Sequence, residues 1–245
     1  MEKDSHNISD DNNIIIDNKY YIKAKKGEGG YSHVFLVKDK ETKKEYAAKI
    51  ITKTSNMSKN ELNICNIIKN QIHNPYIIDF ITNGVGPIKR GKKVSSKFEY
   101  YIFGYASKGD LWKYISQGGF EEKYSKIIFK KILEGVQALH KNKICHRDIK
   151  PHNILLDDNF NPKICDFGFS TLLKGGDSVK LHEIVGTTIF KAPQMYLKNV
   201  SYNGIKADIF SLGVTLFTLV TNKPCFYAAS KKDKYYINII NNHLN

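Results

Sequence analysis

Two short polar motifs in the second half of the chain limit its possible folds more than any other feature. The first runs from His146 to Asn153 and contains Asp148, Lys150 and Asn153. The second is Asp166-Phe167-Gly168. Carboxylate and amide oxygens suit Mg²⁺, which in proteins binds one or two carboxylates together with substrate phosphates. Two charged turns are the alternative, because Asp, Asn and Pro are common in turns. The order and spacing of the two motifs favour a magnesium–phosphate site.

This pair resembles the signature of the protein kinase family, a catalytic loop H-R-D-x-K-x-x-N followed by D-F-G. The resemblance extends from about Tyr20 to the C-terminus. It implies an α+β, bilobal kinase domain over residues 19–245. A small antiparallel β-sheet would form the N-lobe (about 19–103), and a mainly helical C-lobe would follow (about 107–245). It also implies a serine/threonine protein kinase that uses ATP and Mg²⁺ and takes protein substrates with Ser or Thr.

Composition agrees with a globular protein, since 41% of the 245 residues are hydrophobic and 25% are charged. Residues 1–18 are polar and acidic, so we expect a disordered N-terminal tail there and neither a signal nor a transit peptide. No apolar run reaches membrane-spanning length, so no membrane partner is expected. The four cysteines lack metal-ligand spacing and predict reduced thiols in an intracellular, cytoplasmic protein.

The formal net charge of +14 allows nucleic acid, an anionic membrane or acidic proteins as partners. The basic residues are spread along the chain without a nucleic-acid-binding motif, so no nucleic acid is expected. One dense group, Lys89, Arg90, Lys92 and Lys93, falls in a segment that we interpret as a hairpin loop. A solvated loop explains this group, and a docking patch for acidic partners is the alternative.

A glycine-rich turn from Gly27 to Val34 separates two segments of alternating apolar and polar residues, which predicts a strand, a turn and a strand. Glycine lets backbone N–H groups approach phosphate oxygens closely. Glycine-rich hairpins are common, so this motif is weak alone. By resemblance, Gly27 and Gly29 contact the ATP phosphates, Ser32 replaces the third family glycine, and Val34 covers the adenine.

Lys49 lies in a β-rich apolar run, where a lysine is usually just solvent-facing. By resemblance, it grips the α- and β-phosphates of ATP. It then needs an acidic partner. Between Ile50 and Phe98 the only glutamate is Glu61, and apolar residues at helical spacing place it on a helix, so Glu61 is assigned as the structural ion-pair partner.

The kinase hinge corresponds to Phe103–Ala106, with Phe103 at the back of the adenine pocket. By resemblance, the Gly104 carbonyl and the Ala106 N–H pair with the adenine edge. Asp110 falls where the family holds the ribose, and it is equally suited to cap the helix that begins at Leu111. Two further residues complete the ATP-binding set implied by the resemblance: Ala47 and Leu155.

The resemblance also assigns the catalytic roles, because phosphoryl transfer needs positioning and charge neutralisation more than covalent chemistry. Asp148 accepts or orients the proton of the substrate hydroxyl, and Lys150 neutralises the migrating phosphoryl group. Asn153 and Asp166 hold Mg²⁺. Lys150 and the pair Gly186-Thr187 are typical of serine/threonine kinases, in which Thr187 would bridge Asp148 and Lys150.

Arg147 directly precedes the catalytic aspartate, which in the family marks kinases activated by phosphorylation of the activation loop. The usual phosphosite, three residues before the Gly-Thr pair, is Glu183 here. We hypothesise that Glu183 supplies a permanent carboxylate for Arg147, a partial substitute because a phosphate carries roughly two charges. A plain exposed glutamate is the alternative, and Ser178 is a further candidate phosphosite.

Residues 209–220 are apolar nearly all round and predict a buried helix, with Asp208 anchoring the catalytic loop by resemblance. The chain ends about where the family's αG helix finishes, so we expect a C-lobe that lacks its last helices. Gln194, in place of the glutamate of the family's A-P-E motif, agrees with this. The alternative function is therefore a catalytically impaired, kinase-like scaffold or binding protein, whose incomplete C-lobe a partner would cover.

Overall fold

The computed structural model describes residues 14–175, 179–197 and 201–241. They divide into two compact units. The first combines the described residues up to Ser55 with Asp79–Tyr105, and the second combines Asn56–Ile78 with the described residues from Ala106 onwards. The first unit is built from strands and the second mainly from helices, as an α+β chain requires.

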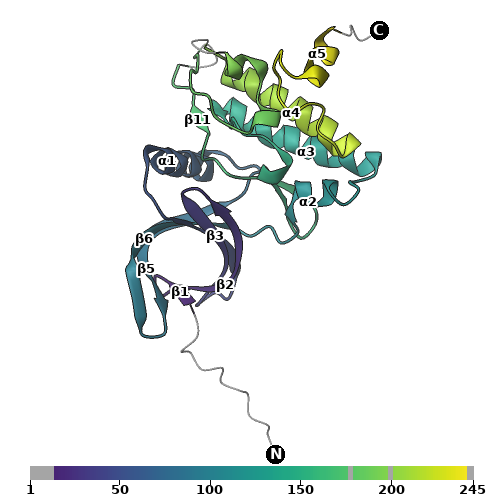
Figure 1. The fold of residues 1–245 in the computed structure, drawn as a ribbon. Coiled ribbons are helices and arrows are strands. Elements are labelled where there is room, and N and C mark those ends of the chain that lie inside the picture. Colours follow the sequence, from purple (N-terminus) through teal and green to yellow (C-terminus); the bar gives the residue numbers. More distant parts are fainter. Residues whose placement is uncertain (1–13, 176–178, 198–200, 242–245) are drawn as a thin grey trace, which may run out of the picture. The chain divides into compact units, whose positions relative to one another are not determined.

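The strands of the first unit close into a barrel in the order β1-β2-β3-β4-β6-β5 (Figure 1). All neighbouring pairs are antiparallel. Their bounds are β1 Ile14–Ile16, β2 Tyr20–Gly29, β3 Ser32–Asp39, β4 Glu45–Ile51, β5 Phe80–Arg90 and β6 Lys93–Gly104. The buried apolar cluster of this unit consists of Ile16, Tyr20, Val37, Ala48, Ile50, Tyr100 and Ile102.

Strand β1 closes this barrel, although it falls within the predicted disordered tail. Ile16 pairs with Tyr20 of β2 and with Ile88 of β5, so β1 covers two strand edges that would otherwise be open. The Tyr100 hydroxyl donates to Asp17 at 2.8 Å. The prediction of disorder is wrong for Ile14–Ile16, because the polarity of the whole segment hid a β-branched run. Residues 1–13 lie outside the described part.

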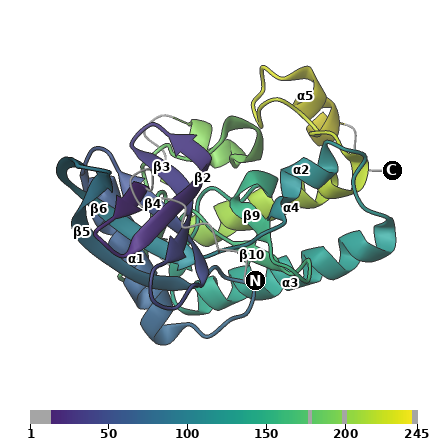
Figure 2. The ribbon, with the colours of Figure 1, turned by 90° about the horizontal axis from the view of Figure 1, so that it is seen from below.

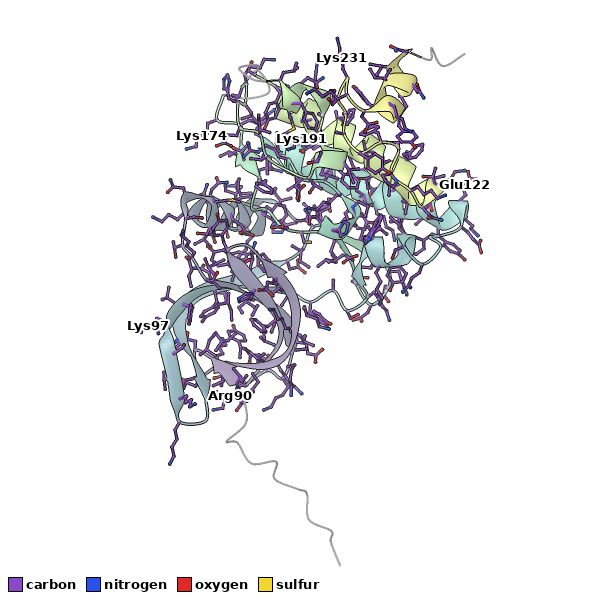
Figure 3. The ribbon with its side chains drawn as sticks, viewed as in Figure 1. Arg90, Lys97, Glu122, Lys174, Lys191 and Lys231 are labelled. Carbon is purple, nitrogen blue, oxygen red and sulfur yellow. The ribbon has the colours of Figure 1, made fainter. Side chains whose placement is uncertain are left out.

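The dense basic group lies in the predicted hairpin. Strand β5 ends at Arg90, and β6 begins at Lys93 after a turn in which Gly91 has φ +55°. Figure 3 shows Arg90 and Lys97 on this hairpin. The prediction of a hairpin is confirmed.

Helix α1 (Asn56–Gln71) belongs to the second unit, whereas the sequence predicted one contiguous N-lobe over 19–103. The Asn60 side-chain amide donates to the Ser170 carbonyl at 2.7 Å. After the helix, Ile77 forms a parallel bridge with Ile164. These contacts join residues that are far apart in sequence. The sequence prediction relied on position along the chain alone and therefore assigned the helix to the first unit.

The second unit is organised around α3 (Glu122–Lys141) and α4 (Gly204–Thr221), which lie side by side (Figure 1; Figure 2). The predicted stripe of α3 is buried at Ile128, Ile132, Val136 and Leu139. The remaining elements are α2 Leu111–Ile115, α5 Lys234–Asn241, β7 Gly109–Asp110, β8 Ile144–Cys145, β9 Ile154–Leu156, β10 Pro162–Ile164, β11 Thr171–Leu172, and the 3₁₀ turns η2 Pro151–Asn153, η4 Thr188–Phe190 and η5 Pro193–Tyr196.

Helix α4 is buried on one face only. Leu212 and Leu219 are buried, whereas Ile209 is 57% exposed and Val220 is 53% exposed. The expectation that residues 209–220 are buried all round is therefore wrong for half of the helix. Within the described residues, α4 is the one helix long and apolar enough to span a membrane. Half of that window is buried inside the unit, as in the core helix of a globular domain.

Candidate active site

The backbone of the catalytic loop is fixed by Asp208, which lies on α4 and is fully buried. Its carboxylate accepts hydrogen bonds from the backbone N–H groups of His146 at 2.8 Å and Arg147 at 2.7 Å. The His140 ring, from α3, lies 2.8 Å from the same carboxylate. Arg147 has φ +65°, a left-handed conformation that is uncommon for residues other than glycine. A buried carboxyl side chain therefore holds a strained loop directly before Asp148.

The ring of His146 fixes the loop from its other side. Its Nε2 lies 3.0 Å from the Cys165 carbonyl, which can only accept, so Nε2 carries the proton. Nδ1 is then the acceptor for the Asp148 N–H at 3.3 Å. The buried ring thereby ties the residue before Asp166 to Asp148, so the two predicted motifs meet through one side chain.

The Asp148 carboxylate is buried and held by three donors. Lys150 Nζ lies 2.8 Å and Asn153 Nδ2 lies 2.9 Å from Oδ2, and the backbone N–H of Thr187 lies 2.8 Å from Oδ1. Lys150 also donates to the Thr187 hydroxyl at 2.6 Å. A carboxylate offers about four acceptor positions. One position on Asp148 therefore remains for an incoming hydroxyl, and the predicted bridge through Thr187 is present.

Gly186 allows this approach of Thr187. Its φ is +86°, and a Cβ at this position would lie 2.5 Å from the Arg147 carbonyl oxygen. Any other residue would push the segment away from the catalytic loop. The glycine of the Gly-Thr pair therefore has a steric role next to Asp148.

Two oxygen groups in the second unit fit a magnesium ion. Asn153 donates through Nδ2 to both the backbone carbonyl and the side chain of Asp148, so its side-chain oxygen Oδ1 is left as an acceptor. That oxygen accepts no hydrogen bond from the described residues. Asp166 is exposed and has φ +63°. One amide oxygen and one carboxylate match the preference of Mg²⁺ for few protein ligands plus phosphate oxygens. No cluster of three or more His, Cys, Asp or Glu suited to a metal occurs in the described ranges.

Glu61 lies next to the Asp166-Phe167-Gly168 motif in the second unit. It is a buried residue of α1, and a Cβ on Gly168 would lie 3.9 Å from its Oε2 and 3.4 Å from Asp166 Oδ1. The carboxylate of α1 is therefore adjacent to the Asp-Phe-Gly motif, although the two are separated by about a hundred residues of sequence.

Arg147 connects the loop to the segment that follows Asp166. Its buried guanidinium donates to the Phe169 carbonyl at 2.6 Å and to Glu183 Oε2 at 2.8 Å. The Tyr202 hydroxyl lies 3.5 Å from the same guanidinium and donates to the Glu183 carbonyl at 2.9 Å. Burial raises the pKa of the Tyr202 hydroxyl, so this group remains a donor. Ser178, the other regulatory candidate, lies outside the described residues.

Three of the predicted ATP-binding residues belong to the second unit: Ala106, Asp110 of β7 and Leu155 of β9. Asp110 pairs in register with Leu155, and its side chain accepts from the Lys113 N–H at 2.9 Å, which makes it the N-cap of α2. The capping interpretation is confirmed, and the ribose interpretation stays a prediction. Ala106 is buried, and its N–H donates to no group in the described ranges, which leaves it available to a ligand.

The remaining predicted ATP-binding residues share the sheet of the first unit. Val34 pairs with Gly27 on one side and with Lys49 on the other. Directly opposed residues of antiparallel strands project to the same face. Ala47, two residues before Lys49, projects to that face as well. Two glycines lie at the ends of the set: Gly29 at the tip of the β2–β3 hairpin and Gly104 at the end of β6, bonded through its N–H to the Asp79 carbonyl at 2.9 Å.

Residues 20–244 match the family described as protein kinase domain. The chain belongs to the protein kinase family. It is 31% identical over 236 residues to CBL-interacting protein kinase 26 of Oryza sativa subsp. japonica, across 92% of this chain and 45% of that relative. It is 39% identical over 138 residues to the human phosphorylase b kinase gamma catalytic chain, liver/testis isoform, across 54% of this chain and 34% of that relative. It is 32% identical over 215 residues to serine/threonine-protein kinase PKH2 of Candida albicans, across 84% and 22%. The chain spans less than half the length of these relatives.

Membership of the protein kinase family confirms the predicted α+β fold class. Two kinase-site residues were missed by sequence reasoning, His140 and Tyr202. Their partners lie 68 and 55 positions away, at Asp208 and Arg147, and neither residue stands in a motif. The only available signal was weak: His140 ends the apolar stripe of α3 shortly before the catalytic loop.

Proposed function

We propose that this protein is an ATP- and Mg²⁺-dependent protein serine/threonine kinase. The observation that carries the proposal is the Asp148 carboxylate, which Lys150, Asn153 and Thr187 hold while one acceptor position stays open. A serine or threonine hydroxyl bonded there would give its proton to Asp148. Its oxygen would form a bond to the γ-phosphorus of ATP as the bond to the bridging oxygen breaks and ADP leaves.

The residues of each unit would contribute separately to this reaction. In the first unit, Gly27, Gly29 and Lys49 would bind the ATP phosphates. In the second, Asn153 and Asp166 would hold Mg²⁺, which supplies neutralisation of the phosphate charge when bound. Lys150 contacts Asp148 and Thr187, next to the position proposed for the substrate hydroxyl. Its ammonium would therefore neutralise charge on the phosphoryl group during transfer.

A cytoplasmic location is part of the same proposal. All four cysteines are free thiols, and Cys65 and Cys145 are buried. Free thiols suit a reducing compartment. Protein substrates with Ser or Thr are the expected partners.

A binding or scaffold function is the second candidate, and the exposed apolar face of α4 favours it. Ile209, Phe217 and Val220 are each more than two-fifths exposed within the described part of the chain. Exposed apolar patches of this kind mark interaction sites. In this alternative a protein partner covers the face, and phosphoryl transfer is weak or lost.

Transfer of radiolabel from [γ-³²P]ATP to a generic protein substrate tests the proposal. We expect transfer by the wild-type protein and its loss in Asp166→Asn, which removes a magnesium ligand but keeps the shape of the side chain. Asp158→Asn is the matched control, because Asp158 is exposed in the turn between β9 and β10 and the asparagine oxygen can still accept the hydrogen bond from the Ser107 hydroxyl. If the wild-type protein binds ATP but transfers no label, the kinase proposal fails and the scaffold function takes its place.

A further inference from the structure

Lys191 is a cation that pairs with no carboxylate of the described residues, and the charge of the active-site residue Asp148 acts on it. It lies between η4 and η5 in the second unit, where Figure 3 labels it. Its ammonium stands over the Tyr196 ring, 5.5 Å from the centroid, and forms no salt bridge or hydrogen bond with the described residues. The side chain is half-buried. Burial lowers the pKa of the Lys191 ammonium, and the Asp148 carboxylate partly offsets that effect.

The segment that carries Lys191 is attached to the catalytic loop. Thr187 bonds both Asp148 and Lys150. The Phe190 N–H donates to the Thr187 carbonyl at 3.0 Å, and the Lys191 N–H donates to the Thr188 carbonyl at 3.3 Å. The Lys191 backbone is thereby held one short turn after Thr187, the residue that bonds Asp148.

Asp148 is the carboxylate whose charge acts on Lys191. It accepts from Lys150, Asn153 and Thr187, and its remaining acceptor position is the one proposed for the substrate hydroxyl. A half-buried charge without a counter-charge is unfavourable, because desolvation is compensated only by pairing or hydrogen bonding. The contact with Tyr196 supplies a weak cation–π attraction. An anionic group of a bound substrate would satisfy the ammonium with a charge-assisted hydrogen bond.

We propose that Lys191 makes this protein select substrates that carry an anionic side chain within a few residues of the target serine or threonine. The proposal rests on the proposed kinase function and names the class of substrate for that site. The anionic group is a carboxylate or a phosphate, and both offer the oxygen acceptors that Lys191 lacks.

Peptides that differ in one position beside a single target serine test this selection. The variable residue is Asp, phosphothreonine, or the neutral Asn. For the wild-type protein we expect kcat/KM to be about tenfold higher for the two anionic peptides than for the Asn peptide, the effect of one partly exposed hydrogen bond to a charged group. In Lys191→Met the ratio should fall to about one, and in Lys191→Arg it should be retained.

Lys231→Met is the matched control, because Lys231 is an exposed lysine of the same unit, before α5 (Figure 3). Each protein is compared through the ratio between its own peptides, so a variant that folds poorly still gives a valid ratio. A wild-type ratio near one, or an unchanged ratio in Lys191→Met, overturns the proposal. A preference for phosphothreonine alone identifies phosphate as the anion, and an equal preference for Asp identifies charge as sufficient.

A binding measurement separates this proposal from the kinase proposal. Fluorescence anisotropy of the labelled peptides reports affinity without any transfer. If no peptide is phosphorylated, the kinase proposal fails, whereas tighter wild-type binding of the Asp peptide that is lost in Lys191→Met still supports the selection. Equal affinity of the wild-type protein for the Asp and Asn peptides would refute it.

Discussion

Replacing Glu183 by alanine tests whether a built-in carboxylate holds the catalytic loop of this kinase. The Glu183 side chain is 71% exposed, whereas its partner Arg147 is 5% exposed, and the two are joined at 2.8 Å. An exposed ion pair contributes about 0.2–1 kcal/mol. Because the buried guanidinium loses an acceptor as well, the upper end of that range applies. Arg147 keeps its bond to the Phe169 carbonyl, so the loss should not go much further.

A loss of about 1 kcal/mol corresponds to roughly a fivefold change in an equilibrium between ordered and disordered loop. We therefore expect kcat/KM of Glu183→Ala to be about fivefold lower than that of the wild-type protein. Glu183→Gln should fall between the two, because an amide oxygen still accepts a hydrogen bond. The difference should shrink in about 1 M salt, where the screening length falls to about 3 Å.

Steady-state peptide phosphorylation before and after phosphatase treatment provides the assay. Wild-type activity should survive the phosphatase, since the carboxylate of Glu183 is permanent. Glu122→Ala serves as control, because it removes an exposed ion pair with Lys126 on α3 (Figure 3). The reasoning is refuted if Glu183→Ala keeps full activity while phosphatase abolishes that of the wild-type protein.

Two further predictions concern stability. Asp208→Asn should lower the free energy of unfolding by about 3 kcal/mol in urea denaturation, because a buried carboxylate that accepts two backbone N–H groups is lost; an unchanged midpoint would contradict the anchoring role. The N–H groups of Thr42 and Glu41 lower the pKa of Asp39 below its ordinary 3.8, so its ionised form stabilises the fold above that pH, and the contribution is lost as the pH falls through the lower, folded-state pKa. Asp39→Asn should therefore flatten the acid limb of the stability curve as the pH falls below the ordinary pKa of 3.8, and an identical acid limb in the variant would contradict this.

The catalytic loop could be predicted because its chemistry and its backbone constraints lie within a few residues. Asp148, Lys150 and Asn153 occupy one short stretch, and the structure brings them to a single hydrogen-bonded cluster. Thr187 joins that cluster from 39 positions away. Its place was predictable only through the resemblance to a family, since no local pattern connects a threonine to a distant aspartate.

Features that depend on long-range packing escaped sequence reasoning. Ile14–Ile16 are three β-branched residues in a polar tail, and only the open edges of β2 and β5 give them a partner. The burial of α4 was overestimated, because a helix apolar all round does not reveal which face meets α3. No sequence pattern singles out Lys191, because the lack of a counter-charge among the described residues is a property of its surroundings in the fold.

The left-handed backbone at Arg147 and Asp166 has a consequence for attempts to make this protein more robust. Each such conformation costs a residue other than glycine on the order of 1–3 kcal/mol, so glycine at either position would relax the chain. The same replacement would delete a guanidinium or a carboxylate. A library screened for heat resistance alone would therefore accumulate glycine at the exposed Asp166 and yield stable but inactive molecules, whereas at Arg147 the lost hydrogen bonds of the buried guanidinium offset the gain. Such a screen must also measure turnover, because here a substitution that raises thermal stability removes a side chain needed for activity.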